Sequence, residues 1–230
     1  MPAGKRFGYP VSCFANYQSI IFDCDGVILN SNKVKTDAFY AAALPYGQAA
    51  AAAMVRYHVQ NGGISRYKKF EYFLCNIAPV DIKGPCLQEL LDAYAHRVKA
   101  GLLACEVADG LESFRQLTSG ARWLVASGGD QAELRELFEV RGLAGWFDGG
   151  IFGSPDAKDI IVKREIKNGN IRMPALFIGD SRYDHQVAQE NGLDFVFLSA
   201  WSEFEQWEAY FEPYSITIQK RLKDLFDGEG

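Results

Sequence analysis

Two aspartates separated by one residue, Asp23 and Asp25, follow a short apolar run and precede Gly26. Carboxylates paired in this way can divide labour, because Asp23 can attack phosphorus while Asp25 handles the proton. Ionised oxygens held close together are also hard ligands that suit Mg²⁺. An acidic turn without any chemistry has the same pattern, so the rest of the chain has to decide.

Hydrogen-bond donors and a cation suited to a phosphoryl group occur further along the chain. Ser127 can donate from its hydroxyl group and Gly128 from its backbone amide, both just after an apolar run. Lys158 can neutralise charge on a phosphate and on Asp23. Lys163, about one helical turn later, is the alternative lysine, although it should lie further from the site.

A second acidic segment, from Gly179 to Asp184, also follows an apolar run. Asp180 and Asp184 can complete an oxygen shell around a metal ion. Ser181 could instead cap a helix, and we interpret His185 as a surface or supporting residue rather than a metal ligand. These segments together predict a phosphoryl-transfer site.

The elements that must position these residues are short apolar runs in alternation with helical segments. Because such runs suit strands that are covered on both faces, they predict an α/β fold with a Rossmann-like parallel sheet and helices on both faces. The carboxyl ends of the strands then meet at one edge, where ligands bind. The expected strands cover residues 19–22, 122–126, 150–152, 175–178 and 194–198.

Helices are expected between these strands and in the tail. The third intervening helix should begin with Ser154 as its N-cap and Pro155 at its first position, and should continue to about Lys167. The other expected helices cover residues 109–117, 131–140, 184–190, 203–210 and 216–226.

The segment 31–104 differs in character from the rest of the chain. It is rich in helix-forming residues and lacks a clear strand, with Gly and Pro breaks between short helical stretches. We therefore expect an inserted α-helical cap domain over 31–104, and a core domain made of 1–30 and 105–230.

Three cations follow the Gly62-Gly63 turn inside this insertion: Arg66, Lys68 and Lys69. A helix start with an arginine beside it can contact an anion. Arg66 lies nearest the glycines and is the residue expected to touch substrate. A solvated helix face is at least as good an explanation for Lys68 and Lys69.

Composition restricts the partners. The chain has 230 residues and a formal net charge of -5, with no long basic run, which argues against nucleic acid or an anionic membrane as the main partner. We find no convincing signal peptide at residues 1–17, and no stretch reaches the roughly 18 apolar residues of a membrane span. Five cysteines without a Cys-x-x-Cys pair favour reduced thiols, and hence a cytoplasmic protein.

The ordered set of motifs resembles the haloacid dehalogenase superfamily, in particular its Mg²⁺-dependent phosphatases with a helical cap. Asp-x-Asp-Gly-Val matches residues 23–27, and the acidic motif Gly-Asp-x-x-x-Asp matches residues 179–184. Ser127 matches the serine or threonine at a strand end, and Lys158 best matches the motif lysine. The resemblance spans roughly residues 19–200, and only the cap and the tail lack a diagnostic pattern.

The resemblance implies a two-step hydrolysis of a small phosphorylated metabolite, such as a sugar phosphate or phosphoglycolate. Asp23 would form an aspartyl phosphate, and Asp25 would act as acid and then as base. Mg²⁺ would be held by Asp23, the main-chain carbonyl of Asp25, Asp180 and, directly or through water, Asp184. An acid at Asp25 disfavours carbon–halogen cleavage, since dehalogenases of this superfamily lack it.

Two alternatives stay open at this point. A phosphosugar mutase would use the same aspartyl phosphate but return the phosphoryl group to a sugar. A non-catalytic binding protein could have the same fold, although it would have no chemical need for both Asp23 and Asp25. Neither the substrate nor the oligomeric state can be inferred from the residues.

Overall fold

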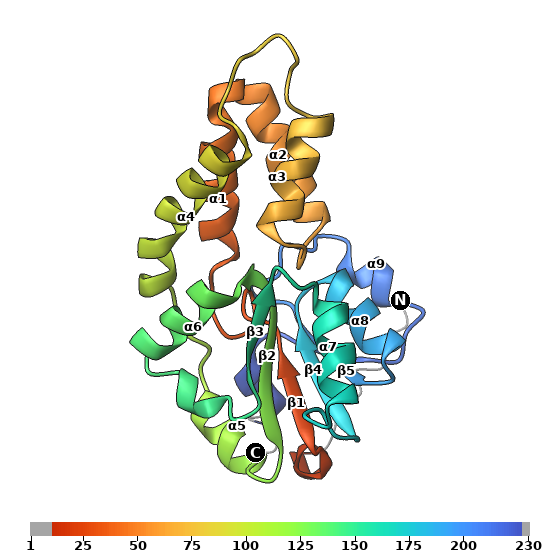
Figure 1. Cartoon of the computed structure of the whole chain (residues 1–230). Coiled ribbons are helices and arrows are strands. Elements are labelled where there is room, and N and C mark those ends of the chain that lie inside the picture. Colours follow the sequence, from red (N-terminus) through yellow and green to blue (C-terminus); the bar gives the residue numbers. More distant parts are fainter. Residues whose placement is uncertain (1–10, 227–230) are drawn as a thin grey trace.

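The computed structural model describes residues 11–226, which form one parallel sheet flanked by helices and a separate group of four helices at one end (Figure 1). The segment 1–10, part of the region considered for a signal peptide, lies outside the described residues. Within 11–226, no helix combines the length and the apolar character needed to cross a membrane. Cys24, Cys75, Cys86 and Cys105 are free thiols, whereas the side chain of Cys13 lies outside the described part.

The sheet formed by the described residues has six strands in the order β3-β2-β1-β4-β5-β6, and every neighbouring pair is parallel. The predicted α/β fold with a parallel sheet is therefore confirmed. The strands are β1 (Ser19–Phe22), β2 (Arg122–Asp130), β3 (Gly150–Ser154), β4 (Ala175–Gly179), β5 (Asp194–Leu198) and β6 (Thr217–Gln219).

Alternate residues of the central strands pack against helices on opposite faces of the sheet. Ile20 and Phe22 belong to the core beneath α5 (Leu111–Leu117) and α6 (Gln131–Val140). Ile21 belongs to the core beneath the helices of the other face. These helices are α7 (Lys158–Lys167), α8 (Arg182–Glu190) and α9 (Trp207–Phe211). Burial of both faces explains why the strands are continuous apolar runs.

The inserted helices have a core of their own. They are α1 (Asn32–Ala43), α2 (Gln48–Gln60), α3 (Arg66–Asn76) and α4 (Leu87–Ala104). Their buried residues, among them Phe39, Met54, Phe70 and Tyr94, form a cluster distinct from the two cores that cover the sheet. Figure 1 shows these four helices above the carboxyl ends of the strands. We call α1–α4 the cap; the domain boundaries at 30/31 and 104/105 stay a prediction.

Short 3₁₀ turns complete the described chain. They are η1 (Val11–Asn16), η2 (Leu44–Tyr46), η3 (Ala144–Trp146) and η4 (Leu222–Leu225).

Two expected helix positions are wrong. The helix after β3 begins at Lys158 with Ala157 as its N-cap, because Ser154 still belongs to β3 and donates its hydroxyl to the Gly128 carbonyl at 2.8 Å. The expected helix over 216–226 is instead strand β6 followed by the turn η4. The backbone of β6 pairs with the exposed edge of β5, and this edge pairing, together with the β-branched Thr217 and Ile218, outweighs the helical pattern.

Strand β2 also extends further than expected. It continues from the apolar run through Ser127 and Gly128 to Asp130, and its pairing with β3 shifts register between Ala126 and Asp130. Asp130 then caps α6 by accepting from the backbone amides of Ala132 and Glu133, each at 3.0 Å. Ser127 is therefore not the cap of that helix.

Candidate active site

Asp23 lies at the point where β1 ends, at the middle of the sheet. Its backbone amide continues the ladder by donating to Ile178 of β4, which puts the end of β1 beside the end of β4. Lys158, in the first turn of α7, lies 2.7 Å from Asp23 Oδ2 and 2.5 Å from Asp184 Oδ1. All three side chains are buried. The residues expected to be the nucleophile and the motif lysine are thus in direct contact.

Asp23, Asp180 and Asp184 form a buried carboxylate cluster whose ligand atoms all lie within 4.8 Å of one another. Burial and the neighbouring acids raise the pKa of Asp23 to about 7, although Lys158 acts in the opposite direction. Burial and the charges of Asp23 and Asp184 also raise the pKa of Asp180 well above its usual value. The cluster therefore holds more negative charge than Lys158 alone can offset.

This donor set fits a hard divalent cation such as Mg²⁺, because it offers clustered carboxylate oxygens in a buried position. Both oxygens of Asp184 accept hydrogen bonds from neighbouring groups. Oδ1 accepts from Lys158, and Oδ2 accepts from the hydroxyl of Ser181 at 2.6 Å. Ser181 in turn caps α8 by accepting from the Asp184 amide. These bonds fix the position of the Asp184 carboxylate.

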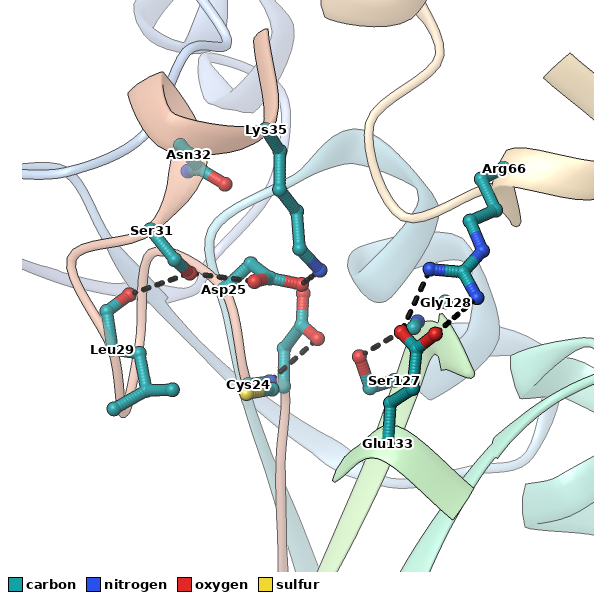
Figure 2. Close-up of polar contacts among 12 residues, drawn as sticks. Cys24, Asp25, Leu29, Ser31, Asn32, Lys35, Arg66, Ser127, Gly128 and Glu133 are labelled. Carbon is teal, nitrogen blue, oxygen red and sulfur yellow. Dashed lines mark hydrogen bonds and ion pairs between the residues drawn. The ribbon is translucent and has the colours of Figure 1, made fainter. Parts of the chain in front are cut away.

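Asp25 is held by two partners from the cap side of the loop (Figure 2). The Ser31 hydroxyl donates to Asp25 Oδ1 at 2.5 Å, and the Lys35 ammonium, from the first turns of α1, donates to Oδ2. Burial acts to raise the pKa of Asp25, but the charge and hydrogen bonds of Lys35 and Ser31 outweigh it and lower the pKa. Lys35 and Ser31 therefore hold Asp25 in place and favour its ionised form.

Sequence reasoning missed Lys35 and Asn32. Asn32 Nδ2 donates to Asp180 Oδ2 at 2.7 Å, so the first residue of α1 contacts the carboxylate cluster. A signal was available in the sequence, since a helix that begins a few residues after the Asp23–Asp25 segment must place its first turn beside that segment. Gly26 makes this approach possible: its φ is +75°, and an added Cβ would come within 2.6 Å of Asn32 Nδ2.

Ser127 is fully buried near the end of β2, and its hydroxyl oxygen accepts from the Gly129 amide at 3.0 Å. Gly128 lies directly beneath the cap, where an added Cβ would overlap the Gly63 carbonyl oxygen of the α2–α3 loop. Figure 2 shows Ser127 and Gly128 across from Asp25, on the neighbouring strand end. The structure therefore brings the Asp23–Asp25 segment and Ser127 to the same edge of the sheet.

A cavity of about 330 Å³ lies between this edge and the cap. Its floor includes Asp23, Asp25 and Asp180, and the loop at Gly62 and Gly63 forms part of its wall. A Cβ added at Gly63 would come within 3.4 Å of both Lys158 Nζ and Ser181 Oγ. The cap loop thus closes directly over the buried carboxylates.

The three cap cations differ from one another. Arg66 lines the cavity, but its guanidinium forms two hydrogen bonds of 2.7 Å with Glu133 of α6, which Figure 2 shows across the cap–core boundary. The Nε atom of Arg66 is buried without a hydrogen-bond partner. Lys68 is exposed. Lys69 is only 2% exposed and lines the cavity, so its expected place on a solvated face is wrong.

Lys163 and His185 lie apart from the carboxylate cluster. The Lys163 side chain is 51% exposed and lies near Asp159 and Glu190 on the outer surface of α7 and α8. His185 is buried rather than on the surface: its Nδ1 atom is 3.0 Å from the Tyr210 hydroxyl, and its ring packs on Phe195 and Phe211. Between the two lysines, only Lys158 contacts the proposed nucleophile.

A family model described as haloacid dehalogenase-like hydrolase matches residues 17–192, a range that includes all four motif segments and the cap. The chain belongs to the haloacid dehalogenase-like hydrolases. The resemblance of its motifs to this superfamily is thereby confirmed. Comparison with curated proteins gives no match.

Solved structures with the same fold have low sequence identity to this member of the family. A predicted phosphatase from Clostridium acetobutylicum is 20% identical with a TM-score of 0.67, and the alignment covers 91% of this chain and 96% of that one. A haloacid dehalogenase-like hydrolase from Streptococcus pneumoniae is 21% identical with a TM-score of 0.65 (91% and 97%). CbbY from Rhodobacter sphaeroides, in complex with phosphate, is 16% identical with a TM-score of 0.62 (88% and 92%). At these identities the likeness establishes the fold.

Proposed function

We propose that this hydrolase is a Mg²⁺-dependent phosphatase that hydrolyses a small phosphate monoester through an aspartyl phosphate on Asp23. The observation that carries the proposal is the buried group of Asp23, Asp180 and Asp184 with Lys158 in contact, at the base of the cavity between cap and core. Nucleophile, cation and metal ligands at one point are what phosphoryl transfer needs. The complex of CbbY with phosphate supports a phosphoryl ligand for this fold.

In the first step, Asp23 attacks the phosphorus atom and the bond to the leaving oxygen breaks. Asp25 enters this step with a proton taken up from solvent and delivers it to that oxygen. In the second step, water attacks the aspartyl phosphate, Asp25 takes a proton from this water, and the bond to Asp23 breaks. Ser127 and the Gly128 amide donate to the phosphoryl oxygens, and Lys158 offsets charge on Asp23 and the phosphate. After it has given up its proton in the first step, Asp25 is ionised and can accept the proton of the attacking water.

Asp23, the main-chain carbonyl of Asp25, Asp180 and Asp184 would hold the Mg²⁺ ion. When bound, the ion supplies positive charge that reduces the repulsion between an ionised nucleophile and an anionic ester. Such an ion also lowers the cost of keeping three carboxylates together in a buried position.

The cavity between cap and core favours a small soluble ester, such as a sugar phosphate or phosphoglycolate. Its volume of about 330 Å³ is at the lower end of ligand pockets. The loop that carries Gly62 and Gly63 forms part of the cavity wall above the acids, which disfavours a protein or nucleic-acid substrate. Arg66 is the cap residue that would contact the substrate. Its guanidinium group would release Glu133 and bind an anionic or hydroxyl group of the ligand instead.

The test measures phosphate release from a panel of small esters with and without Mg²⁺, for the native chain, Asp23→Asn and the surface control Asp37→Asn. Release that needs the metal and falls by at least ~10³-fold in Asp23→Asn, but not in Asp37→Asn, supports the proposal. Isomerisation of a sugar phosphate without release would instead identify a mutase.

A second measurement separates an enzyme from a binding protein on the same fold. Beryllium fluoride with Mg²⁺ mimics a phosphorylated aspartate, so the two together should raise the melting temperature of the native chain but not that of Asp23→Asn. No shift for the native chain, combined with no release from any ester, would contradict the phosphatase proposal.

A further inference from the structure

Three lysines lie in or beside the active-site cavity, Lys69 and Lys158 buried and Lys35 half-buried, and two of them have carboxylate partners. Lys158 contacts Asp23 and Asp184, and Lys35 contacts Asp25. Lys69 is different: within residues 11–226, no carboxylate lies within 4.0 Å of its ammonium group. A buried cation without a counter-ion is costly unless something anionic comes to it.

The partner of Lys69 in the structure is neutral. Its Nζ atom lies 2.6 Å from His58 Nδ1 and 3.3 Å from the His58 carbonyl oxygen. Burial and the charges of Lys69 and Lys35 hold the pKa of His58 well below its usual value, so the ring is uncharged. An uncharged imidazole accepts one hydrogen bond from the ammonium group but does not cancel its charge. With the carbonyl as second acceptor, one of the three N–H donors of Lys69 is left for a ligand.

Both side chains are held rigidly by their surroundings. The His58 ring packs against Phe39 with ring centroids 4.4 Å apart, and Lys69 Nζ lies 5.5 Å from the Phe39 centroid. Behind the ring, His58 Nε2 lies 3.9 Å from Glu203, whose two oxygens accept from the Thr36 hydroxyl at 2.8 and 2.9 Å. This backing positions His58, which in turn positions the ammonium group before any ligand arrives.

The Lys69 side chain is part of the wall of the active-site cavity. Lys69, His58 and Lys35 line the same cavity as Asp23 and Asp25. The charges of Lys35, Asp25, Glu203 and Lys158 all act on Lys69, which places it within electrostatic reach of the reacting groups from the cap side. A molecule small enough for this cavity can therefore contact the floor with one end and Lys69 with the other.

We propose that Lys69, backed by His58, is the receptor for a second anionic group on the substrate, a carboxylate or another phosphate, at the end opposite the phosphoryl group that is removed. This inference rests on the proposed phosphatase function and narrows its substrate class to doubly anionic esters. The ammonium group and the incoming anion form a charge-assisted hydrogen bond that replaces the missing counter-ion. Esters with a neutral group at that end leave Lys69 without a counter-ion.

The test uses ester pairs that differ only in the second anionic group. One pair is 2-phosphoglycolate and 2-hydroxyethyl phosphate, and the other is glucose 1,6-bisphosphate and glucose 6-phosphate. In one pair at least, we expect kcat/KM to be about 10- to 100-fold higher for the doubly anionic member. The pair that shows this preference identifies carboxylate or phosphate as the group that is bound.

The variants are Lys69→Met, which keeps the length of the side chain without its charge, and Lys68→Met, which removes the neighbouring exposed lysine of the same helix. The preference should collapse in Lys69→Met and persist in Lys68→Met. Because Lys69→Met removes an uncompensated buried charge, its melting temperature should not fall below that of the native chain. A native enzyme without a preference in either pair, or a preference that survives in Lys69→Met, overturns the inference.

A binding measurement keeps this test independent of turnover. Phosphonoacetate and ethylphosphonate are not hydrolysed as esters, and only the former has a carboxylate beside its phosphonate. We expect tighter calorimetric binding of phosphonoacetate, by about tenfold or more, to the native chain but not to Lys69→Met. If this preference is present while no ester is hydrolysed, the receptor stands and the phosphatase proposal fails. If esters are hydrolysed but no preference for the second anionic group is found, the phosphatase proposal stands and the receptor role of Lys69 fails.

Discussion

The ammonium group of Lys35 donates to the carboxylate of Asp25, so a residue of the first cap helix holds one of the two acids of the loop that follows β1. Ser31 is the other partner of this carboxylate. The chain between Asp25 and Lys35 is also the connection between core and cap. Any movement of α1 relative to the sheet therefore changes how Asp25 is held, which couples the position of the cap to the group that we propose transfers the proton.

Replacement of Lys35 by Met should reduce kcat by about 10- to 100-fold and change KM little, since Asp25 loses its orienting partner but the substrate contacts remain. The measurement is steady-state kinetics on the best ester of the panel. Lys33→Met, an exposed position of the same helix that pairs with Asp37, is the matched control. Equal kcat values for the two variants would show that Asp25 does not depend on Lys35.

Lys158→Met should reduce kcat by at least ~10²-fold, because the charges of Asp23 and of the transferred phosphoryl group lose their fixed cation. Lys163→Met, on the exposed side of the same helix, should stay within twofold of the native enzyme, a margin of about 0.4 kcal/mol. Circular dichroism of both variants checks that α7 is intact. If Lys163→Met reduced kcat more than Lys158→Met does, Lys163 would be the motif lysine.

The central strands and the residues at their ends could be predicted from the sequence because both depend on local patterns. Four-residue apolar runs such as 19–22 fit only strands covered on both faces, and parallel pairing brings Asp23, Ser127 and Asp180 to one edge. The contacts made by the cap could not be predicted, since they depend on how helices that are distant in the sequence pack against one another. The burial of Lys69 against His58 joins two helices, and nothing local distinguishes it from the exposed Lys68.

Arg66→Ala should raise KM for the true substrate by about 10- to 100-fold and lower kcat less, because Arg66 lines the cavity without contact to the reacting acids. Its pair with Glu133 has to open for this contact, so Glu133→Gln, which weakens the competing partner, should lower KM. Arg56→Ala, exposed on α2, is the control. An unchanged KM across the ester panel would rule out a binding role for Arg66.

Gly128→Ala should reduce kcat/KM by about tenfold or more, since the added methyl group would overlap the Gly63 carbonyl and push the cap loop away from the floor. Backbone atoms on both sides leave no side chain that could move aside. Gly120→Ala adds the same methyl group where nothing lies within 4 Å, and should leave the kinetics unchanged. Native kinetics in Gly128→Ala would mean that the cap loop does not need this close approach.

The stability difference between Lys69→Met and the native chain should depend on pH in a defined direction. Burial, with the charge of Lys35, lowers the pKa of Lys69 to about 7 in the folded chain, against an ordinary value of 10.5. Between these two values the unfolded chain binds more protons than the folded one, so the contribution of Lys69 to the free energy of unfolding rises with pH across this window. Below pH 7 the full destabilising effect of Lys69 is present, and above pH 10.5 this effect vanishes.

Lys69→Met should therefore be more stable than the native chain near pH 6.5, by an amount that shrinks toward pH 9.5 in thermal melts without ligand. A stability difference that does not change with pH would show that Lys69 keeps an ordinary pKa and has a counter-ion in solution.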